Sequence, residues 1–147
     1  MLDELFGFGT PRSHYVDECR FCNRSILRGD VVFEEPRAFF VTSIDPVLTR
    51  AGLIIPKRHI QSPFDMNKRE WADVQKLLKK AKDYLHGGDA TGFNVGWNDG
   101  SDAGQTEDHA HLHIIARFSD EPLRGKGIRY IFKQKENARP GALVSES

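Results

Sequence analysis

Three histidines alternate with apolar residues in the run His109-Ala110-His111-Leu112-His113-Ile114-Ile115. On a β-strand, residues two apart share a face, with side chains ~6.6 Å apart per step, so the three imidazoles would line one face. Ala110, Leu112 and Ile114 would then point to the opposite face. On a helix the same residues would spread around most of the circumference. The alternation therefore predicts a strand that packs one face on the core and presents three imidazoles on the other.

Three interpretations of this strand are open. The histidines are structural residues of a half-buried strand, or all three bind a metal, or one imidazole is a nucleophile and its neighbours hold substrate or a structural metal. Asn98, Gln105 and Thr106 are neutral donors near the run, and glycines in the loop 98–104 let backbone amides approach an anion. Gly, Ser and Asp also dominate ordinary turns. The loop favours a phosphoryl substrate over a bare hydrolytic metal.

The only two cysteines lie close together in Cys19-Arg20-Phe21-Cys22. This spacing is half of a tetrahedral zinc site, whose other two ligands must come from elsewhere in the chain. A redox pair would follow a strand in a βαβ unit, whereas this pair follows the polar stretch from Thr10 to Glu18. Two unconnected thiols are the remaining interpretation.

The composition is that of one globular domain. The chain has 147 residues, of which 39% are hydrophobic and 29% charged. Lys and Arg total 21, as do Asp and Glu, so the net charge of zero favours neither nucleic acid nor an anionic membrane as an obligate partner. The start of the chain carries acid where a secretory signal carries base, and apolar runs such as Leu53-Ile54-Ile55 are too short to span a bilayer. We therefore expect a cytoplasmic protein.

One helix and five strands must position these residues. Strands are expected at 31–33, 38–41, 52–55, 92–97 and along the histidine run. The helix is expected from about residue 68 to 85, because Asn67 and Glu70 have the spacing of a capping box and Gly87-Gly88 ends the pattern. Its apolar stripe follows at spacings of three or four: Trp71, Val74, Leu77, Leu78, Ala81 and Leu85.

The histidine run resembles the His-φ-His-φ-His-φ-φ motif of the histidine triad (HIT) superfamily of nucleotide hydrolases and transferases. Further blocks from about residue 18 to 132 are similar to the family's ordered blocks, and the tail suggests the bacterial, diadenosine polyphosphate hydrolase-like branch. These blocks are Asp45-Pro46, Leu53 to Ile60, Phe93 to Gly96, Gly100 to Thr106 and Arg124 to Tyr130. The resemblance implies an α+β domain with a five-stranded antiparallel sheet and one main helix, often a homodimer. We expect an N-terminal arm at 1–17, the HIT domain at 18–132 and a flexible tail at 133–147.

The resemblance also implies a structural zinc ion and a division of labour among the histidines. In zinc-bearing members the Cys-x-x-Cys pair is joined by the His of the Pro-Lys-x-His block and by the first triad His. Here these ligands are Cys19, Cys22, His59 and His109. Four protein ligands make a closed site with no open position for water.

The middle histidine, His111, is then the nucleophile that attacks the α-phosphorus and forms a nucleotidyl-histidine intermediate. By the same resemblance Asn98 and His113 contact the α-phosphate, and Gln105 and Thr106 hold phosphate or bridging oxygens. The catalytic set is thus Asn98, Gln105, His111 and His113. The substrate-binding set is Asn98, Gln105, Thr106 and His113, together with Ser43 and Ile44.

The sequence departs from the family pattern at three places. Ser43 stands where an acid or Asn often binds ribose, Arg50-Ala51 replaces a common Gly-His, and Glu107-Asp108 replaces apolar or aromatic residues. Glu107 and Asp108 put negative charge near an anionic substrate, or serve to orient His109 or His59.

The expected function is hydrolysis of a nucleotide conjugate, either a dinucleoside polyphosphate or a nucleoside phosphoramidate. Arg124, Lys126 and Arg129 either meet extra phosphates or form a solvated tail. The alternatives are a nucleotidyl transferase or phosphorylase of the same superfamily, and a non-catalytic nucleotide-binding scaffold. A scaffold is disfavoured by the intact set His111, Asn98 and Gln105, because a protein that only binds a nucleotide needs no nucleophile.

Overall fold

A computed structural model describes residues 14–142 of the chain. Its regular elements, in chain order, are η2 (Arg24–Ile26), β1 (Val31–Glu35), β2 (Ala38–Thr42), β3 (Ala51–Pro56), η3 (Pro63–Asp65), α2 (Lys68–His86), β4 (Gly92–Trp97), η4 (Ser101–Ala103), β5 (Leu112–Arg117) and η5 (Lys135–Asn137). Most of the N-terminal arm expected at 1–17, and the last five residues of the expected tail, lie outside the described residues.

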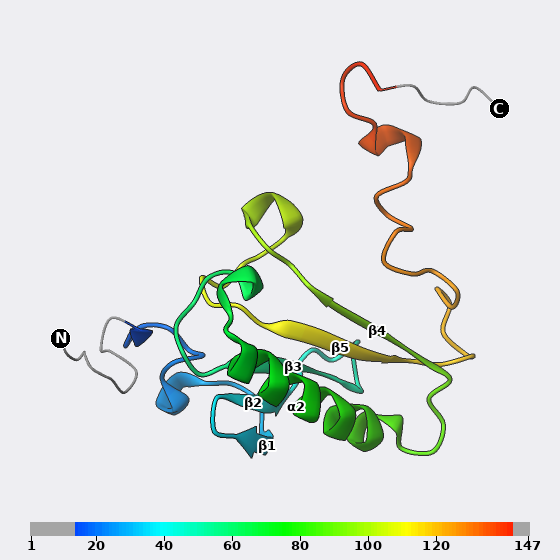
Figure 1. Cartoon of the computed structure of the whole chain (residues 1–147). Coiled ribbons are helices and arrows are strands. Elements are labelled where there is room, and N and C mark those ends of the chain that lie inside the picture. The colour runs from blue at the N-terminus through cyan, green and yellow to red at the C-terminus, as the bar shows by residue number, and fades with distance from the viewer. Residues whose placement is uncertain (1–13, 143–147) are drawn as a thin grey trace.

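The five strands form a single antiparallel sheet in the order β1-β2-β3-β5-β4. Helix α2 lies across one face of this sheet (Figure 1). The α+β class, the single domain, the five-stranded sheet and the one main helix expected from the sequence are confirmed. Among residues 14–142, no helix combines the length and the apolar character needed to cross a membrane.

The main core lies between α2 and the sheet. Phe40, Ile54, Leu77 and Ile114 are each no more than 1% exposed and belong to this cluster. A second, smaller cluster covers the other face of the sheet, where Phe21 of the N-terminal loop packs with Phe39, Val41 and Ile55. Strand β2 is therefore buried on both faces, and the N-terminal loop is held against the sheet face opposite to α2.

Helix α2 begins and ends as its sequence predicts. The Asn67 side chain accepts a hydrogen bond from the Glu70 amide, the Glu70 carboxylate accepts one from the Asn67 amide, and Gly87 follows the helix in a left-handed conformation at φ 58°. Trp71 does not join the buried stripe as predicted, since it is 43% exposed. Its ring lies at the edge of the core, where the helix passes beside β4.

Beyond β5 the chain leaves the sheet through a series of turns and extends away from it (Figure 1). Arg117 holds the start of this segment by donating hydrogen bonds to the carbonyls of Leu123 and Lys126. Large apolar side chains further along remain exposed, including Ile131 at 66% and Phe132 at 62%.

Candidate active site

The histidine run is only partly a strand. Strand β5 begins at Leu112, so the prediction of a strand along the whole run is wrong for His109 to His111. The ladders of β5 with β3 and with β4 both end at Leu112, and the Ala110 amide instead donates to the Ile60 carbonyl at 2.7 Å. The segment before β5 is therefore bonded to the loop after β3 and does not continue the ladder.

The alternation of the run is nevertheless retained. Ala110, Leu112 and Ile114 are buried in the core beneath α2. The rings of His111 and His113 lie edge to face with centroids 4.9 Å apart. The apolar residues hold the segment on the core, and the histidines are directed to the sheet face opposite to α2.

The His111 imidazole is fixed in one tautomer by the backbone. Its Nδ1 lies 2.9 Å from the His109 carbonyl oxygen, which can only accept a hydrogen bond. Nδ1 must therefore carry the proton, and Nε2 of the neutral ring keeps its lone pair. Burial lowers the pKa of His111, against the opposing effects of this hydrogen bond and of the Glu107 charge. The ring is thus held neutral with a nucleophilic nitrogen available.

His113 brings a second imidazole nitrogen to the same place. Its Nε2 is buried and forms no hydrogen bond with any residue in 14–142. Burial, and to a smaller extent the neighbouring His111, lowers the pKa of His113. A buried polar atom without a partner costs about 1–3 kcal/mol, so this nitrogen is a ready contact for a bound ligand.

The neutral donors predicted to hold phosphate have different surroundings. Asn98 is exposed directly after β4, and Thr106 is exposed in the loop before His109. The Gln105 side chain is fully engaged, because its Oε1 accepts from the Gly100 amide at 2.8 Å and its Nε2 donates to the carbonyls of Gln61 and Glu107. Gln105 therefore fixes the loop 100–107, and its contact with phosphate stays a prediction.

A cleft of about 390 Å³ lies on this face of the sheet and is separated from His111 by the Phe21 ring. Ser43, Ile44 and Leu53 line it together with Phe21. The Phe21 ring is 2% exposed and lies edge to face with the His111 ring at 5.1 Å between centroids. The structure thus brings the predicted residues Ser43 and Ile44 into one cleft that Phe21 separates from the nucleophile.

The four predicted metal ligands come together. One donor atom from each of Cys19, Cys22, His59 and His109 lies within 4.8 Å of all the others. Nδ1 of His109 is 3.2 Å from Nδ1 of His59 and 3.5 Å from both sulfurs. Ligands at ordinary zinc distances in a tetrahedron are about 3.3–3.8 Å apart, so the cluster has the dimensions of a zinc site.

The protonation of this cluster also suits a cation. The His109 Nε2 donates to the Pro56 carbonyl at 2.6 Å, which leaves Nδ1 with its lone pair toward the cysteines. Burial lowers the pKa of His109 to about 4 and raises the pKa of the Cys22 thiol to about 11. A metal ion would offset the cost of the buried thiolates. The four residues can therefore bind a metal ion.

The partner of Glu107 is not evident from the sequence. Its carboxylate lies 3.0 Å from the Arg20 guanidinium in an ion pair, and among residues 14–142 it makes no side-chain bond to His59 or His109. Asp108 is exposed. In the sequence, Arg20 and Phe21 are only the two residues between the cysteines. The residues that they contact, Glu107 and His111, are about 90 positions further along the chain.

The basic segment at 124–129 begins at the end of β5 opposite to His111, where Lys126 lines a separate cleft with Arg117 and Tyr130. Its ammonium is 4.8 Å from the centroid of the Tyr130 ring. Further along, Ile128 reaches Gly96, the β4 residue paired with His113. Whether Arg124, Lys126 and Arg129 meet phosphates stays a prediction.

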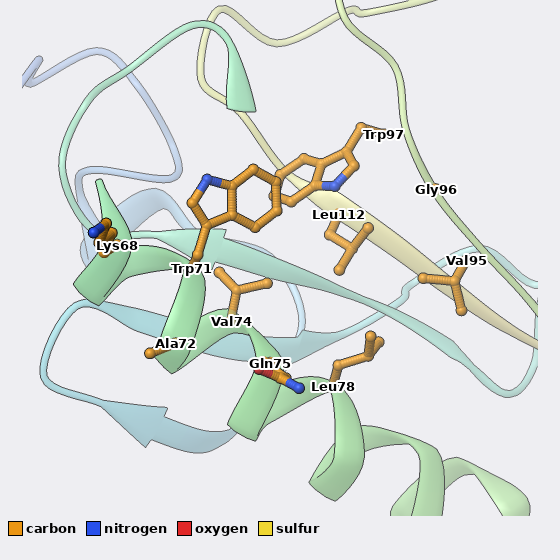
Figure 2. Close-up of a pocket in the computed structure, with 10 residues that line it drawn as sticks. All are labelled: Lys68, Trp71, Ala72, Val74, Gln75, Leu78, Val95, Gly96, Trp97 and Leu112. Carbon is orange, nitrogen blue, oxygen red and sulfur yellow. The ribbon is translucent and has the colours of Figure 1, made fainter. Parts of the chain in front are cut away.

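A further cleft lies on the α2 face of the sheet, between the first half of α2 and β4 (Figure 2). The indoles of Trp71 and Trp97 meet there edge to face, with centroids 5.8 Å apart. Leu78, Val95 and Leu112 complete the apolar lining of this cleft, whose volume is about 630 Å³. No histidine lines this cleft, so it is separate from the candidate active site.

The sequence model of the HIT domain family matches residues 26–120, which is more than half of the chain. The chain therefore belongs to this family. It is 30% identical over 96 residues to a bis(5'-adenosyl)-triphosphatase of Dictyostelium discoideum, an alignment that covers 63% of this chain and 62% of that protein. The chain thus spans less than two thirds of that relative. It is 30% identical over 113 residues to an adenosine 5'-monophosphoramidase of Schizosaccharomyces pombe, covering 74% of this chain and 81% of that one.

A solved structure of the family has the same fold. The Zn-bound histidine triad family protein from Mycobacterium smegmatis matches with a TM-score of 0.59 and 29% identity, over 72% of this chain and 79% of that one. The fold is therefore that of the HIT family.

Proposed function

We propose that the protein hydrolyses a nucleotide conjugate, a dinucleoside polyphosphate or a nucleoside phosphoramidate, by attack of His111 on the α-phosphorus. The observation that carries this proposal is the hydrogen bond from His111 Nδ1 to the His109 carbonyl, which leaves Nε2 as the nucleophile. The cleft of Ser43 and Ile44 lies beyond Phe21, whose ring touches that of His111. The triphosphatase and the phosphoramidase named among the relatives support both substrate classes.

The reaction has two balanced steps. The Nε2 lone pair forms a bond to the α-phosphorus while the bond from phosphorus to the leaving group breaks, and the leaving group departs with that electron pair and takes up a proton. Water then attacks the same phosphorus, the bond to Nε2 breaks, and the nucleoside monophosphate is released with His111 restored. Each displacement is easier than the single uncatalysed one.

The neighbouring groups stabilise charge on the phosphoryl oxygens. His113 Nε2, buried and without a partner in residues 14–142, and the exposed amide of Asn98 would contact these oxygens. Gln105, which also fixes the loop 100–107, and Thr106 would hold phosphate or bridging oxygens. Ser43 and Ile44 bind the nucleoside.

We further propose that Cys19, Cys22, His59 and His109 hold a structural Zn²⁺. The distances among the four donor atoms and the zinc-bound relative support this proposal. A zinc ion in a closed site supplies folding energy, and all chemistry at phosphorus is left to the histidines. A homodimer, and domain limits at 18–132 with an N-terminal arm and a C-terminal tail, belong to the same proposal.

Replacing the nucleophile tests the proposed function. We expect His111→Ala to abolish turnover of diadenosine triphosphate and of adenosine phosphoramidate while the circular dichroism spectrum and zinc content stay unchanged. Asn98→Ala should lose a smaller factor, about 10²-fold in kcat, because it removes one donor to the phosphoryl oxygens. The matched control is His86→Ala, since His86 is an exposed histidine at the end of α2.

Mass spectrometry of the acid-quenched protein should find a nucleotidyl group on His111. Near-native turnover by His111→Ala would overturn the assignment of the nucleophile. Transfer of the nucleotidyl group to phosphate faster than to water would indicate a phosphorylase. Binding without turnover by the wild-type protein would indicate a nucleotide-binding scaffold.

A further inference from the structure

Two arginines, Arg20 and Arg28, line the cleft of Ser43 and Ile44. Arg20 lies at the Phe21 end, where its guanidinium is 4.8 Å from the centroid of the Phe21 ring, and that ring touches the His111 ring. Arg28 lines the cleft from the turn before β1. Nothing in the proposed chemistry at His111 uses these two arginines.

The turn before β1 places Arg28 beside Ser43. Gly29 follows Arg28 in a left-handed conformation at φ 95°, which side chains rarely adopt. The Asp30 amide donates to Thr42 Oγ1 at 3.1 Å, and the Thr42 amide donates to the Asp30 carbonyl at 3.0 Å. These bonds join the turn to the end of β2, directly before Ser43, so the position of Arg28 is fixed by the fold.

The charge of Arg28 is not neutralised within the cleft. The only carboxylate that lines it, Asp45, accepts hydrogen bonds at Oδ1 from the amides of Val47 and Leu48 and so closes its own turn. Arg20 is paired with Glu107, but no carboxylate of residues 14–142 forms an ion pair with Arg28. Arg28 is thus available to an anionic ligand.

The Ser43 side chain offers a donor to the same ligand. Its Oγ accepts a hydrogen bond from the Asp45 amide at 3.0 Å, which leaves the hydroxyl proton free to donate. Carboxylates recognise the hydroxyl groups of an unmodified ribose, whereas an arginine accommodates a phosphate on the ribose. A serine donor beside an arginine matches the second chemistry.

The apolar walls indicate where the parts of a nucleotide would lie. With the α-phosphate at His111, a base would lie against Ile44 and Leu53, and the sugar would face the polar edge at Ser43 and Arg28. We propose that this cleft selects nucleotides whose ribose carries a second phosphoryl group at the 2′ or 3′ position, bound by Arg28 and Ser43. This inference rests on the proposed function, because it places the α-phosphate at His111.

Binding to the full-length His111→Ala variant tests the inference apart from turnover. Titration calorimetry would compare AMP with adenosine 3′,5′-bisphosphate, adenosine 2′,5′-bisphosphate and ADP. We expect one bisphosphate to bind about tenfold more tightly than AMP, because a charge-assisted contact with Arg28 is added. The position of that phosphate, 2′ or 3′, is given by which of the two isomers is preferred.

A second substitution identifies the arginine. Arg28→Gln, added to the His111→Ala chain, should abolish the preference for the bisphosphate and leave AMP binding within about twofold. Arg24→Gln is the matched control, because Arg24 is a nearby cation that pairs with Glu34 and does not line the cleft. It should keep the preference.

Equal affinity for AMP and both bisphosphates would overturn the inference while leaving the proposed function intact. An Arg28-dependent preference for ADP would place the second phosphate on the leaving side and would also overturn it. Failure of all four ligands to bind would contradict the inference and the proposed function together. In the wild-type chain the kcat/KM for a ribose-phosphorylated adenosine phosphoramidate should exceed that for the unmodified compound by a similar factor.

Discussion

His109 connects the metal cluster to the nucleophile through three different atoms. Its Nδ1 faces the cysteines and His59, its Nε2 donates to the Pro56 carbonyl, and its own carbonyl accepts from His111 Nδ1. Phe21 adds a second link, since its ring lies edge to face with both His109 and His111. The ring and the carbonyl of His109 therefore join the cluster to the group that fixes the tautomer of His111.

The metal prediction belongs to this scale. We expect one zinc per chain by atomic emission, and Cys22→Ser should lose it because three ligands hold zinc far more weakly than four. Chelation of the wild-type protein should lower its Tm by more than about 5 °C, since binding to the folded state alone stabilises that state. The His111→Ala chain is the control and should keep its zinc.

A Tm that is the same with and without chelator would contradict a structural metal. Loss of turnover that returns at once on adding metal, without a change in Tm, would instead indicate a catalytic metal.

At the scale of single residues, the sequence predicts the site residues that lie in recognisable motifs. It does not predict contacts between residues that are far apart along the chain. The metal ligands Cys19, Cys22, His59 and His109 follow from the family resemblance, and their donor atoms meet. The ion pair between Arg20 and Glu107 joins residues 87 positions apart, and no local pattern encodes it. The same holds for Arg28, whose place beside Ser43 depends on the pairing of β1 with β2.

Helix α2 shows the same division at the scale of an element. Its first residue, capping box and C-terminal glycine follow from local rules and are confirmed. Strand β4 is also found with the predicted bounds. Strand β5 starts three residues later than expected, because β4 ends at Trp97 opposite Leu112 and the Ala110 amide donates to the Ile60 carbonyl instead. Local rules predict where an element can form, and the neighbouring strands decide how far it extends.

The buried start of α2 gives a prediction about pH. Glu70 is 3% exposed and forms an ion pair with Arg58 at 2.7 Å. Burial alone would raise the pKa of Glu70, but the hydrogen bonds from Arg58 and the Asn67 amide outweigh it and lower this pKa. His14 adds a small lowering effect, and Asp65 acts on Arg58.

Because the pKa of Glu70 is lower in the folded state, its stabilisation is present above about pH 4.3, the ordinary Glu value, and is lost as the pH falls further. We expect Glu70→Gln to reduce the free energy of unfolding by about 2 kcal/mol at pH 7. Urea denaturation from pH 7 to pH 3 should show this difference shrinking below about pH 4. Glu136→Gln, at an exposed carboxylate, is the control, and a difference that does not change with pH would contradict the assignment.

At the scale of the whole molecule, the two edges of the sheet are unlike. Edge strand β1 carries a register irregularity, and Glu34 and Glu35 form ion pairs with lysines and an arginine. Charges and bulges of this kind protect an edge from pairing with another chain. Edge strand β4, Gly92–Trp97, has no charged residue, and within residues 14–142 it pairs only with β5. The cleft of Trp71 and Trp97 lies beside it (Figure 2).

These features make β4 the edge through which the proposed homodimer would form. Two copies related by a two-fold axis would pair their β4 strands and continue the sheet, with the apolar cleft of each copy at the junction.

Val95 is 37% exposed in the middle of β4, so a lysine there would bring like charges together at the axis. We expect light scattering to give twice the chain mass for the wild type at about 10 µM, and Val95→Lys to weaken the dimer at least about tenfold. Phe64→Lys, at a residue 83% exposed in η3, is the matched control and should remain dimeric. A monomeric wild type at this concentration, or equal weakening by both lysines, would rule out β4 as the dimer edge.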